Sequence, residues 1–403
     1  MYSYIGMEFI QLLSLDDNDE NRKRISKPYN DVLKIFFQNL NDANNSYKEN
    51  KKKIIHNKMF IDDDNIDLND KNIFFPELIR NHIQKFSSTK YIYRFNIYDR
   101  IILIEFVFFN TIPSKKEMNS HLKKIYLWLH ILSLYANSEC TKTLKINIYF
   151  SNFKKKLPSN LLINKEQILD AINVNTAWTY RCKEHNSITI YRKEEWFKVL
   201  CHETIHTFGL DFSSDTDTNI KLMCEKIFNV QSDFLLSESY CEFWATIWST
   251  IFNAYCICDS PKEFNEFSQI YNDLIFNEKQ FSIFQTLKVL NYMKLNYFDL
   301  FDFKLSRKQF IENTNVFCYY IIKSILLFND KKTLDFFLDI NSNILNFENT
   351  NKNVIKFVKF IDKNKLDMNF IEILNEIQRR KYILHKEYNN TDLLRTLKMT
   401  LHG

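Results

Sequence analysis

Hydrophobic residues recur along this chain with two different periods, and each change of period predicts where helices give way to strands. In the first 88 residues the pattern is mainly that of polar helices. Two charged, asparagine-rich stretches, residues 41–53 and 62–71, are expected to be loops or linkers. Pro76 is expected to open a short helix, Glu77–Phe86, because proline suits the first turn of a helix.

Alternating hydrophobic and polar positions begin near residue 90. This alternation predicts strands at 90–98, 100–110 and 144–151 and a hairpin of strands 176–181 and 187–192. Hydrophobic residues at helical spacing predict helices at 114–137 and about 193–208. This order predicts an α+β fold in which a small mixed sheet lies between a backing helix and the helix at 193–208.

Beyond residue 234 the pattern is helical. The expected helices are 234–258, 261–297, 306–328, 332–347 and 353–380. We therefore predict three regions: a mainly helical N-terminal region (1–88), a sheet-containing core (89–258) and a helical C-terminal lobe (259–403). A cleft between two such lobes is a natural place for an active site.

The helix expected at 193–208 carries a specific chemical pattern, His202-Glu203-Thr204-Ile205-His206. Residues four apart share one face of a helix, so both imidazoles can reach one metal ion at about 2.0–2.1 Å. Glu203 is rotated by about 100° from His202, which places it beside the ion as a base for a metal-bound water. Gly209 is the one glycine of three that lies away from the termini. It follows the motif where a helix ending in a left-handed turn would need it.

A catalytic zinc site takes three protein ligands and keeps one open position. We assign the third ligand to Glu238, which shares a helix face with Glu242, so that one carboxylate can bind the ion while the other orients a histidine. Glu225 and Asp211 are the alternatives. Glu225 lies in an ordinary amphipathic segment, and Asp211 falls one residue before the position at which a related metal-site pattern places its ligand.

Together, His202-Glu203-x-x-His206 and Glu238-x-x-x-Glu242 resemble the gluzincin family of zinc metallopeptidases. The distal glutamate helix of that family often reads Asn-Glu-Gly-Phe-Ala-Glu-Tyr-Phe-Ala, and here a serine, Ser239, replaces the glycine. The sequence around the motif is also similar to predicted metalloproteases of large DNA viruses. The resemblance covers about residues 170–250. It implies a zincin-like core, one Zn²⁺ ion per chain, and a peptide or protein substrate.

The resemblance further implies peptide-bond hydrolysis. Glu203 would activate the attacking water and later protonate the leaving amine, while zinc would polarise the scissile carbonyl. Such enzymes usually add a tyrosine or histidine that stabilises the oxyanion, and strand 187–192 could bind substrate as an added strand. The tyrosines considered for the oxyanion role are Tyr240, Tyr271, Tyr292, Tyr319 and Tyr320.

Composition adds expectations about the setting of the protein. The net charge of +5 comes without an arginine-rich stripe, so we expect no nucleic-acid partner. The start lacks a basic leader and the longest uncharged run, 243–258, is shorter than the roughly 20 residues that span a bilayer. We therefore expect no membrane partner and a cytoplasmic, non-secreted protein, with virion association as the alternative. The eight cysteines form no pairing motif, which predicts free thiols in a reducing compartment.

Two other functions remain open from the sequence. Zinc amidases of the deformylase type also use this five-residue motif, with an upstream cysteine ligand for which Cys182 is available, although the surrounding sequence of that family is absent. A non-catalytic scaffold or virion protein held by a structural metal is the second alternative. Glu203 argues against it, because a structural site has no use for a base.

Overall fold

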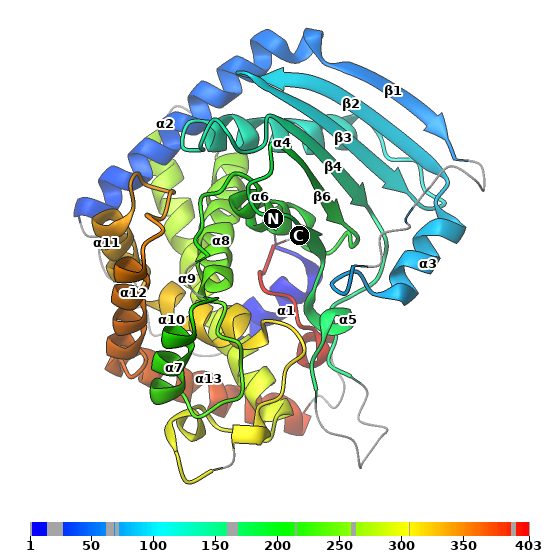
Figure 1. The fold of residues 1–403 in the computed structure, drawn as a ribbon. Coiled ribbons are helices and arrows are strands. Elements are labelled where there is room, and N and C mark those ends of the chain that lie inside the picture. The colour runs from blue at the N-terminus through cyan, green and yellow to red at the C-terminus, as the bar shows by residue number, and fades with distance from the viewer. Residues whose placement is uncertain are drawn as a thin grey trace.

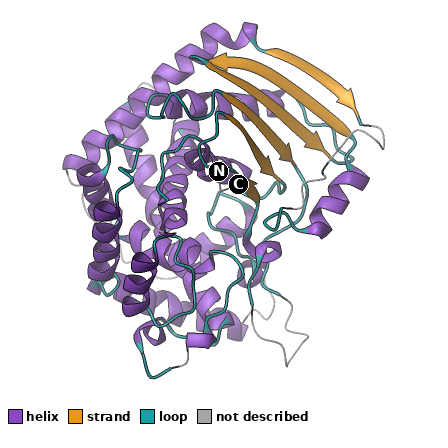
Figure 2. Ribbon diagram, in the orientation of Figure 1, coloured by secondary structure: helices purple, strands orange, loops and turns teal. Residues whose placement is uncertain are grey.

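The computed structural model describes residues 2–13, 27–61, 68, 72–158, 168–213, 216–258, 263–305, 307–387 and 392–402. These residues form an α+β fold, in which a six-stranded mixed sheet in the N-terminal half packs against a mostly helical C-terminal region (Figures 1 and 2). The predicted α+β class is confirmed.

The sheet has the strand order β1-β2-β3-β4-β6-β5. β4 runs parallel to both of its neighbours, β3 and β6, and the remaining pairs are antiparallel. The strands are β1 (Ile55–Phe60), β2 (Thr89–Ile97), β3 (Arg100–Phe108), β4 (Thr143–Tyr149), β5 (Ala177–Thr179) and β6 (His185–Ile190). The predicted strands and hairpin are confirmed as β2 to β6, and β1 is an edge strand that the pattern did not predict.

The asparagine-rich stretch 41–53 is not the loop that we predicted. Most of it continues helix α2 (Lys27–Asn50), which a turn of 3-10 helix, η2 (Lys51–Lys53), closes. The helix buries one face, on which Phe36, Leu40 and Ala43 are almost inaccessible, and its polar residues occupy the other face. Packing of that apolar stripe outweighs the weak helix preference of asparagine. Most of the second stretch, 62–71, lies outside the described residues.

The expected sandwich is also corrected, because the backing helix and the motif helix lie on the same face of the sheet. Helix α4 (Lys115–Ser133) and helix α6 (Trp196–Thr207) are joined by a 2.7 Å hydrogen bond from Trp128 Nε1 to Thr204 Oγ1, both buried. Figure 1 shows the two helices beside each other, between the sheet and the C-terminal helices. The buried indole of Trp128 packs between α4 and α6. Both helices therefore cover the same face of the sheet, and α4 does not cover the other face.

One end of the other face is covered by helix α3 (Glu77–Phe86), which begins at Pro76 as predicted. Its buried Ile79 and Ile83 pack against Val107 and Tyr149 of the sheet. These residues belong to a second, smaller hydrophobic core beside β5. The main hydrophobic core lies on the other face of the sheet, with α4 and α6.

The C-terminal region is built around helix α8, whose central residues are buried on every side. Its helices are α7 (Thr218–Ile227), α8 (Leu236–Ile257), α9 (Phe264–Tyr292), a π-helix η6 (Phe317–Ile322), α10 (Lys323–Phe328), α11 (Asp330–Ile340), α12 (Asn351–Asn364) and α13 (Met368–Glu387). The short elements α1 (Tyr4–Leu13), α5 (Ala171–Val174), η4 (Tyr297–Phe301), η5 (Arg307–Gln309) and α14 (Asp392–Arg395) complete the described structure.

The helix predicted at 353–380 is two helices, α12 and α13, which meet at Asp367. The Asp367 carboxylate accepts hydrogen bonds from the backbone N–H groups of Asn369 and Phe370, at 3.1 and 3.2 Å, and so caps the start of α13. The main hydrophobic core runs through all three regions that we predicted, and the division between them stays a prediction. Within the described residues, no helix is both long enough and apolar enough to cross a bilayer.

Candidate metal centre

Helix α6 presents the histidine motif from inside the protein. All twelve of its residues are buried, and it ends at Phe208, just before Gly209. Gly209 has φ +65°, and the N–H of Leu210 donates back to Ile205 O at 3.0 Å. The prediction of a left-handed glycine that terminates this helix is confirmed.

His202, His206 and Glu238 bring their side chains to one point. The two imidazole Nε2 atoms are 3.1 Å apart, and Glu238 Oε2 lies 3.1 Å from His202 Nε2 and 3.6 Å from His206 Nε2. Ligands about 2.0–2.1 Å from a tetrahedral zinc ion are roughly 3.3 Å from one another. The three atoms therefore form a triangle of the size that one metal ion requires, and this buried group could hold such an ion.

Glu225 does not take part in this triangle. It lies on α7, where its carboxylate is 3.4 Å from Arg307 Nη1, and it belongs to neither of the potential metal-binding groups in the described part of the chain. Its partner and its partial exposure are those of a surface acid on an amphipathic helix.

Asp211 lies on the far side of His206 from the triangle. Its Oδ2 is 2.6 Å from His206 Nδ1, and Arg181 donates to the same carboxylate from Nε and Nη2 at 2.6 to 3.1 Å. Cys241 Sγ is 3.7 Å from the same Nδ1, so these three side chains could also group around an ion. A separation of 2.6 Å is that of a hydrogen bond and is too short for two ligands of one ion. Asp211 therefore orients His206 for the first group.

His202 Nδ1 faces the carboxylate of Glu242 at ion-pair distance. Glu242 Oε1 lies 2.9 Å from His202 Nδ1, while Oε2 forms a buried ion pair with Lys198. Each histidine therefore has a carboxylate at Nδ1 that favours Nε2 facing the triangle, and each carboxylate has its own cation. We predicted that Glu242 would orient a histidine, and the structure brings it to that position. Lys198, one helical turn before His202, was not predicted.

The pKa values of these groups show how strongly the cluster attracts positive charge. Burial lowers the pKa of both histidines, but neighbouring acidic groups outweigh it: Glu238 and Glu242 raise the pKa of His202, and Cys241, Asp211 and Glu238 raise that of His206. Burial by itself raises the pKa of Glu238, yet the two histidines lower it well below its ordinary value. A divalent cation at the triangle would replace bound protons as the source of positive charge.

Glu203 faces a cavity of about 200 Å³ that the three potential ligands also line. The side chain is 8% exposed, and burial raises its pKa although the two histidines act in the opposite direction. The cavity wall also contains the three residues of β5 near the sheet end and Tyr319. A carboxylate with a raised pKa inside the cavity of a metal group is suited to exchanging protons there.

Only one of the five tyrosines considered from the sequence lines this cavity. Tyr319 lies on the π-helix η6, with its ring 6.0 Å from that of His202. The hydroxyls of Tyr240 and Tyr320 donate to backbone carbonyls of Leu345 and Leu397, at 2.9 and 2.6 Å. The hydroxyl of Tyr271 bonds that of Tyr29, and Tyr292 is not among the residues that line the cavity. π-Helical turns frequently mark functional sites. The pattern of hydrophobic residues along the sequence does not reveal where a π-helix forms.

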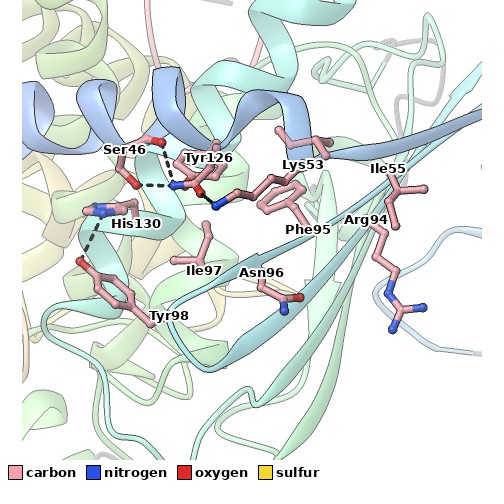
Figure 3. Close-up of a pocket in the computed structure, with 12 residues that line it drawn as sticks. Ser46, Lys53, Ile55, Arg94, Phe95, Asn96, Ile97, Tyr98, Tyr126 and His130 are labelled. Atoms are coloured by element: carbon pink, nitrogen blue, oxygen red, sulfur yellow. Dashed lines mark hydrogen bonds between the residues drawn. The ribbon is translucent and has the colours of Figure 1, made fainter.

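A larger cavity, of about 630 Å³, lies between the end of α2, strands β1 and β2, and α4 (Figure 3). Lys53 Nζ bonds Asn50 and Tyr98 bonds His130, whereas Arg94 extends away from them (Figure 3). Among the described residues that line this cavity there is no carboxylate, and the cationic groups do not converge. This larger cavity therefore lacks the converging ligands that the smaller cavity at His202, His206 and Glu238 contains.

Cysteine usage differs from the prediction of free thiols. Cys140 and Cys182 form a disulfide, and the other six cysteines form none. Disulfides are rare in reducing compartments, so the cysteines no longer support the expected setting. The disulfide also occupies the sulfur of Cys182, which counts against the ligand set that a deformylase-type amidase would need.

No protein-family model, no curated protein and no solved structure matches this chain.

Replacing Asp211 with asparagine should lower zinc affinity by ~10–100-fold without unfolding the protein. The amide keeps the shape of the side chain but removes the charge that holds His206 Nδ1. Competition with a chromophoric chelator measures the affinity. Asp233→Asn, at an exposed surface pair with Lys221, is the matched control and should change nothing; equal affinities for both variants would contradict the orienting role.

Proposed function

We propose that this protein is a zinc-dependent metallopeptidase with a zincin-like core, in which His202, His206 and Glu238 bind the ion and Glu203 is the general base. The observation that carries the proposal is that three potential ligands converge on one point and share a cavity with a fourth acidic side chain, Glu203. Two nitrogen donors and one carboxylate oxygen suit zinc. When bound, the ion would polarise the scissile carbonyl and make a water molecule more acidic.

The residues of this chain supply the remaining chemistry. Glu203 takes a proton from the attacking water and delivers it to the amine that leaves. Tyr319, which lines the same cavity, would donate a hydrogen bond to the oxygen of the tetrahedral intermediate. Asp211 and Glu242 hold the two imidazoles in the orientation that directs Nε2 into the cavity.

An extended peptide fits the end of the sheet beside this cavity. We expected strand 187–192 to accept substrate, but β6 is paired on both sides, with β4 and β5, and cannot take a further strand there. β5 is the outermost strand, and Ala177, Trp178 and Thr179 all line the cavity. Within the described residues no strand pairs with the outer edge of β5, which is therefore the better place for an added substrate strand.

A structural metal is less consistent with these contacts. The group at the triangle contains three potential ligands in the described part of the chain, and most of the residues that line the cavity beside it are polar. A structural site is normally closed by four protein ligands. The acidic side chain of Glu203 beside three ligands is the arrangement expected of a catalytic centre.

The direct test is digestion of a random-sequence peptide library by purified protein, with metal content measured on the same sample. We expect about one zinc per chain and cleavage that stops after chelation and returns with Zn²⁺. Mass spectrometry of the products separates internal cleavage from removal of terminal residues. A zinc-loaded protein that leaves every peptide intact would contradict the proposal.

Replacing Tyr319 with phenylalanine should lower kcat by ~10²–10³-fold, with little change in KM or in zinc content, because the lost hydrogen bond acts on the transition state. Steady-state kinetics on one cleaved peptide measures this split. Tyr292→Phe removes a hydroxyl outside the cavity lining and should retain full activity. A Tyr319→Phe enzyme of normal kcat would assign the oxyanion to another donor.

A further inference from the structure

The disulfide lies directly on the metal-binding helix. Cys140 is buried in the segment after α4, and Cys182 is exposed in the turn between β5 and β6. Their Cα atoms are 4.7 Å apart, and 42 positions separate them in the sequence. The bond thus joins two segments that lie at the C-terminal end of α6 and that also pair through the backbone, from Thr141 N–H to Lys183 O at 2.8 Å.

Both joined segments donate hydrogen bonds to the last turn of α6. The backbone N–H of Cys182 donates to His206 O at 3.1 Å, and Thr141 Oγ1 donates to Thr207 O at 2.5 Å. The final carbonyls of a helix have no partners within the helix, so donors from elsewhere must satisfy them. Two donors, one at the disulfide and one next to it, therefore hold the turn that carries His206.

Gly209, which follows the end of α6, lies close to both cysteines of the disulfide. A Cβ atom at this position would lie 2.8 Å from Cys140 Sγ and 3.1 Å from Cys182 Cβ. The disulfide and the left-handed turn after α6 consequently share one tightly packed space. A shift of either sulfur atom therefore displaces the backbone at Gly209, directly after the motif.

Arg181, the residue before Cys182, extends the contact to the second side of His206. Its guanidinium holds Asp211, whose carboxylate bonds His206 Nδ1. The turn that contains the disulfide therefore supports His206 twice, through its backbone carbonyl and through its imidazole.

The backbone beside the disulfide is held in conformations that it would leave if released. Thr141 has φ +62° and Cys182 has φ +38°, and neither residue is glycine. Such conformations persist only where the surrounding structure enforces them. Opening the bond removes one of those constraints and lets both segments relax away from α6.

We propose that the Cys140–Cys182 disulfide is a thiol-exchange site whose reduction loosens the metal centre, so that metal affinity depends on the redox state of the protein. The proposal rests on the proposed function, because it takes the triangle to be a metal site. Cys182 is the exposed residue of the pair. A dithiol attacks it through one thiolate and expels Cys140; its second thiol then resolves the mixed disulfide and releases Cys182. The dithiol is oxidised to its own disulfide, and its two electrons and two protons end on the cysteine pair.

The test compares the Zn²⁺ affinity of the same full-length protein in two redox states. One sample is kept oxidised; the other is reduced with a phosphine, which is removed under nitrogen before titration against a chromophoric chelator. We expect the reduced protein to stay folded by circular dichroism and to bind Zn²⁺ ~10–100-fold more weakly, the usual effect of losing an outer support of a metal ligand.

Matched variants separate this effect from general thiol chemistry. Cys140→Ser/Cys182→Ser should bind Zn²⁺ as weakly as reduced protein in both conditions, whereas Cys256→Ser, at an exposed free cysteine, should keep the difference. Arg181→Gln should weaken binding in the oxidised state and shrink the redox effect, because both act through His206. If the double variant does not fold, the two redox states of the unmodified chain still decide the question.

The outcomes are distinguishable. Equal affinities in the two redox states of the unmodified protein overturn the redox proposal and leave the peptidase proposal standing. Alkylation of both Cys140 and Cys182 in the folded, unreduced protein also overturns it. An oxidised protein that binds no Zn²⁺ overturns the metal site itself, and the redox proposal falls with it.

Discussion

Replacing Glu203 with glutamine should leave zinc bound and lower turnover by ~10²–10⁴-fold, the range expected when a general acid–base is lost. Glutamine has nearly the same shape as glutamate but cannot accept the proton of the attacking water. Because Glu203 lies outside the triangle of His202, His206 and Glu238, the substitution removes no ligand. Metal content and kcat on one cleaved peptide, measured on the same preparation, check both parts.

Glu225→Gln is the matched control, since Glu225 lies on α7 beside Arg307 and belongs to no potential metal group in the described residues. It should retain full activity. A Glu203→Gln protein that turns over at the normal rate would remove the general base from the mechanism, and one that loses zinc would show that Glu203 acts on the site in another way.

Replacing Glu238 with alanine should reduce zinc affinity by more than ~100-fold, beyond the effect of losing an orienting partner, and should abolish cleavage. It removes one of three converging ligand atoms and leaves the two Nε2 atoms, 3.1 Å apart, without the carboxylate that lies between 3.1 and 3.6 Å from each. Zinc per chain after dialysis, together with chelator competition, measures the loss.

Glu225→Ala is the matched control for Glu238→Ala. Both glutamates follow the motif in sequence, and either could have supplied the ligand on spacing alone. Glu225→Ala should bind zinc like the unmodified protein. Loss of zinc from Glu225→Ala and retention by Glu238→Ala would reverse the assignment of the third ligand.

Local structure explains why the histidine pair and the proposed general base, Glu203, could be named from the sequence. Residues four apart on a helix meet on one face whatever the rest of the chain does. The same holds for Gly209, whose left-handed conformation ends the helix and needs no distant partner. The order of β2 to β6 was equally readable, because alternation within each strand is a local property.

Other local patterns were misleading because packing determined the outcome. The asparagine-rich end of α2 was expected to be a loop, but its apolar stripe keeps it helical against the core. Helix α4 was expected on the face of the sheet opposite α6, but Trp128 packs α4 against α6 on the same face. Both errors arise because a pattern along one segment does not reveal which surface that segment will meet.

What the amino-acid sequence determined by itself is the motif, its glycine stop and the class of fold, all of which follow from periodicities over a few residues. Only the tertiary structure brought Glu238, and not Glu225, to the two histidines, set Asp211 against His206, lined the cavity with Tyr319 alone of the five tyrosines, and joined Cys140 to Cys182. Each of these contacts links side chains far apart in sequence. Their distances depend on how whole helices and the sheet pack, which no short pattern encodes.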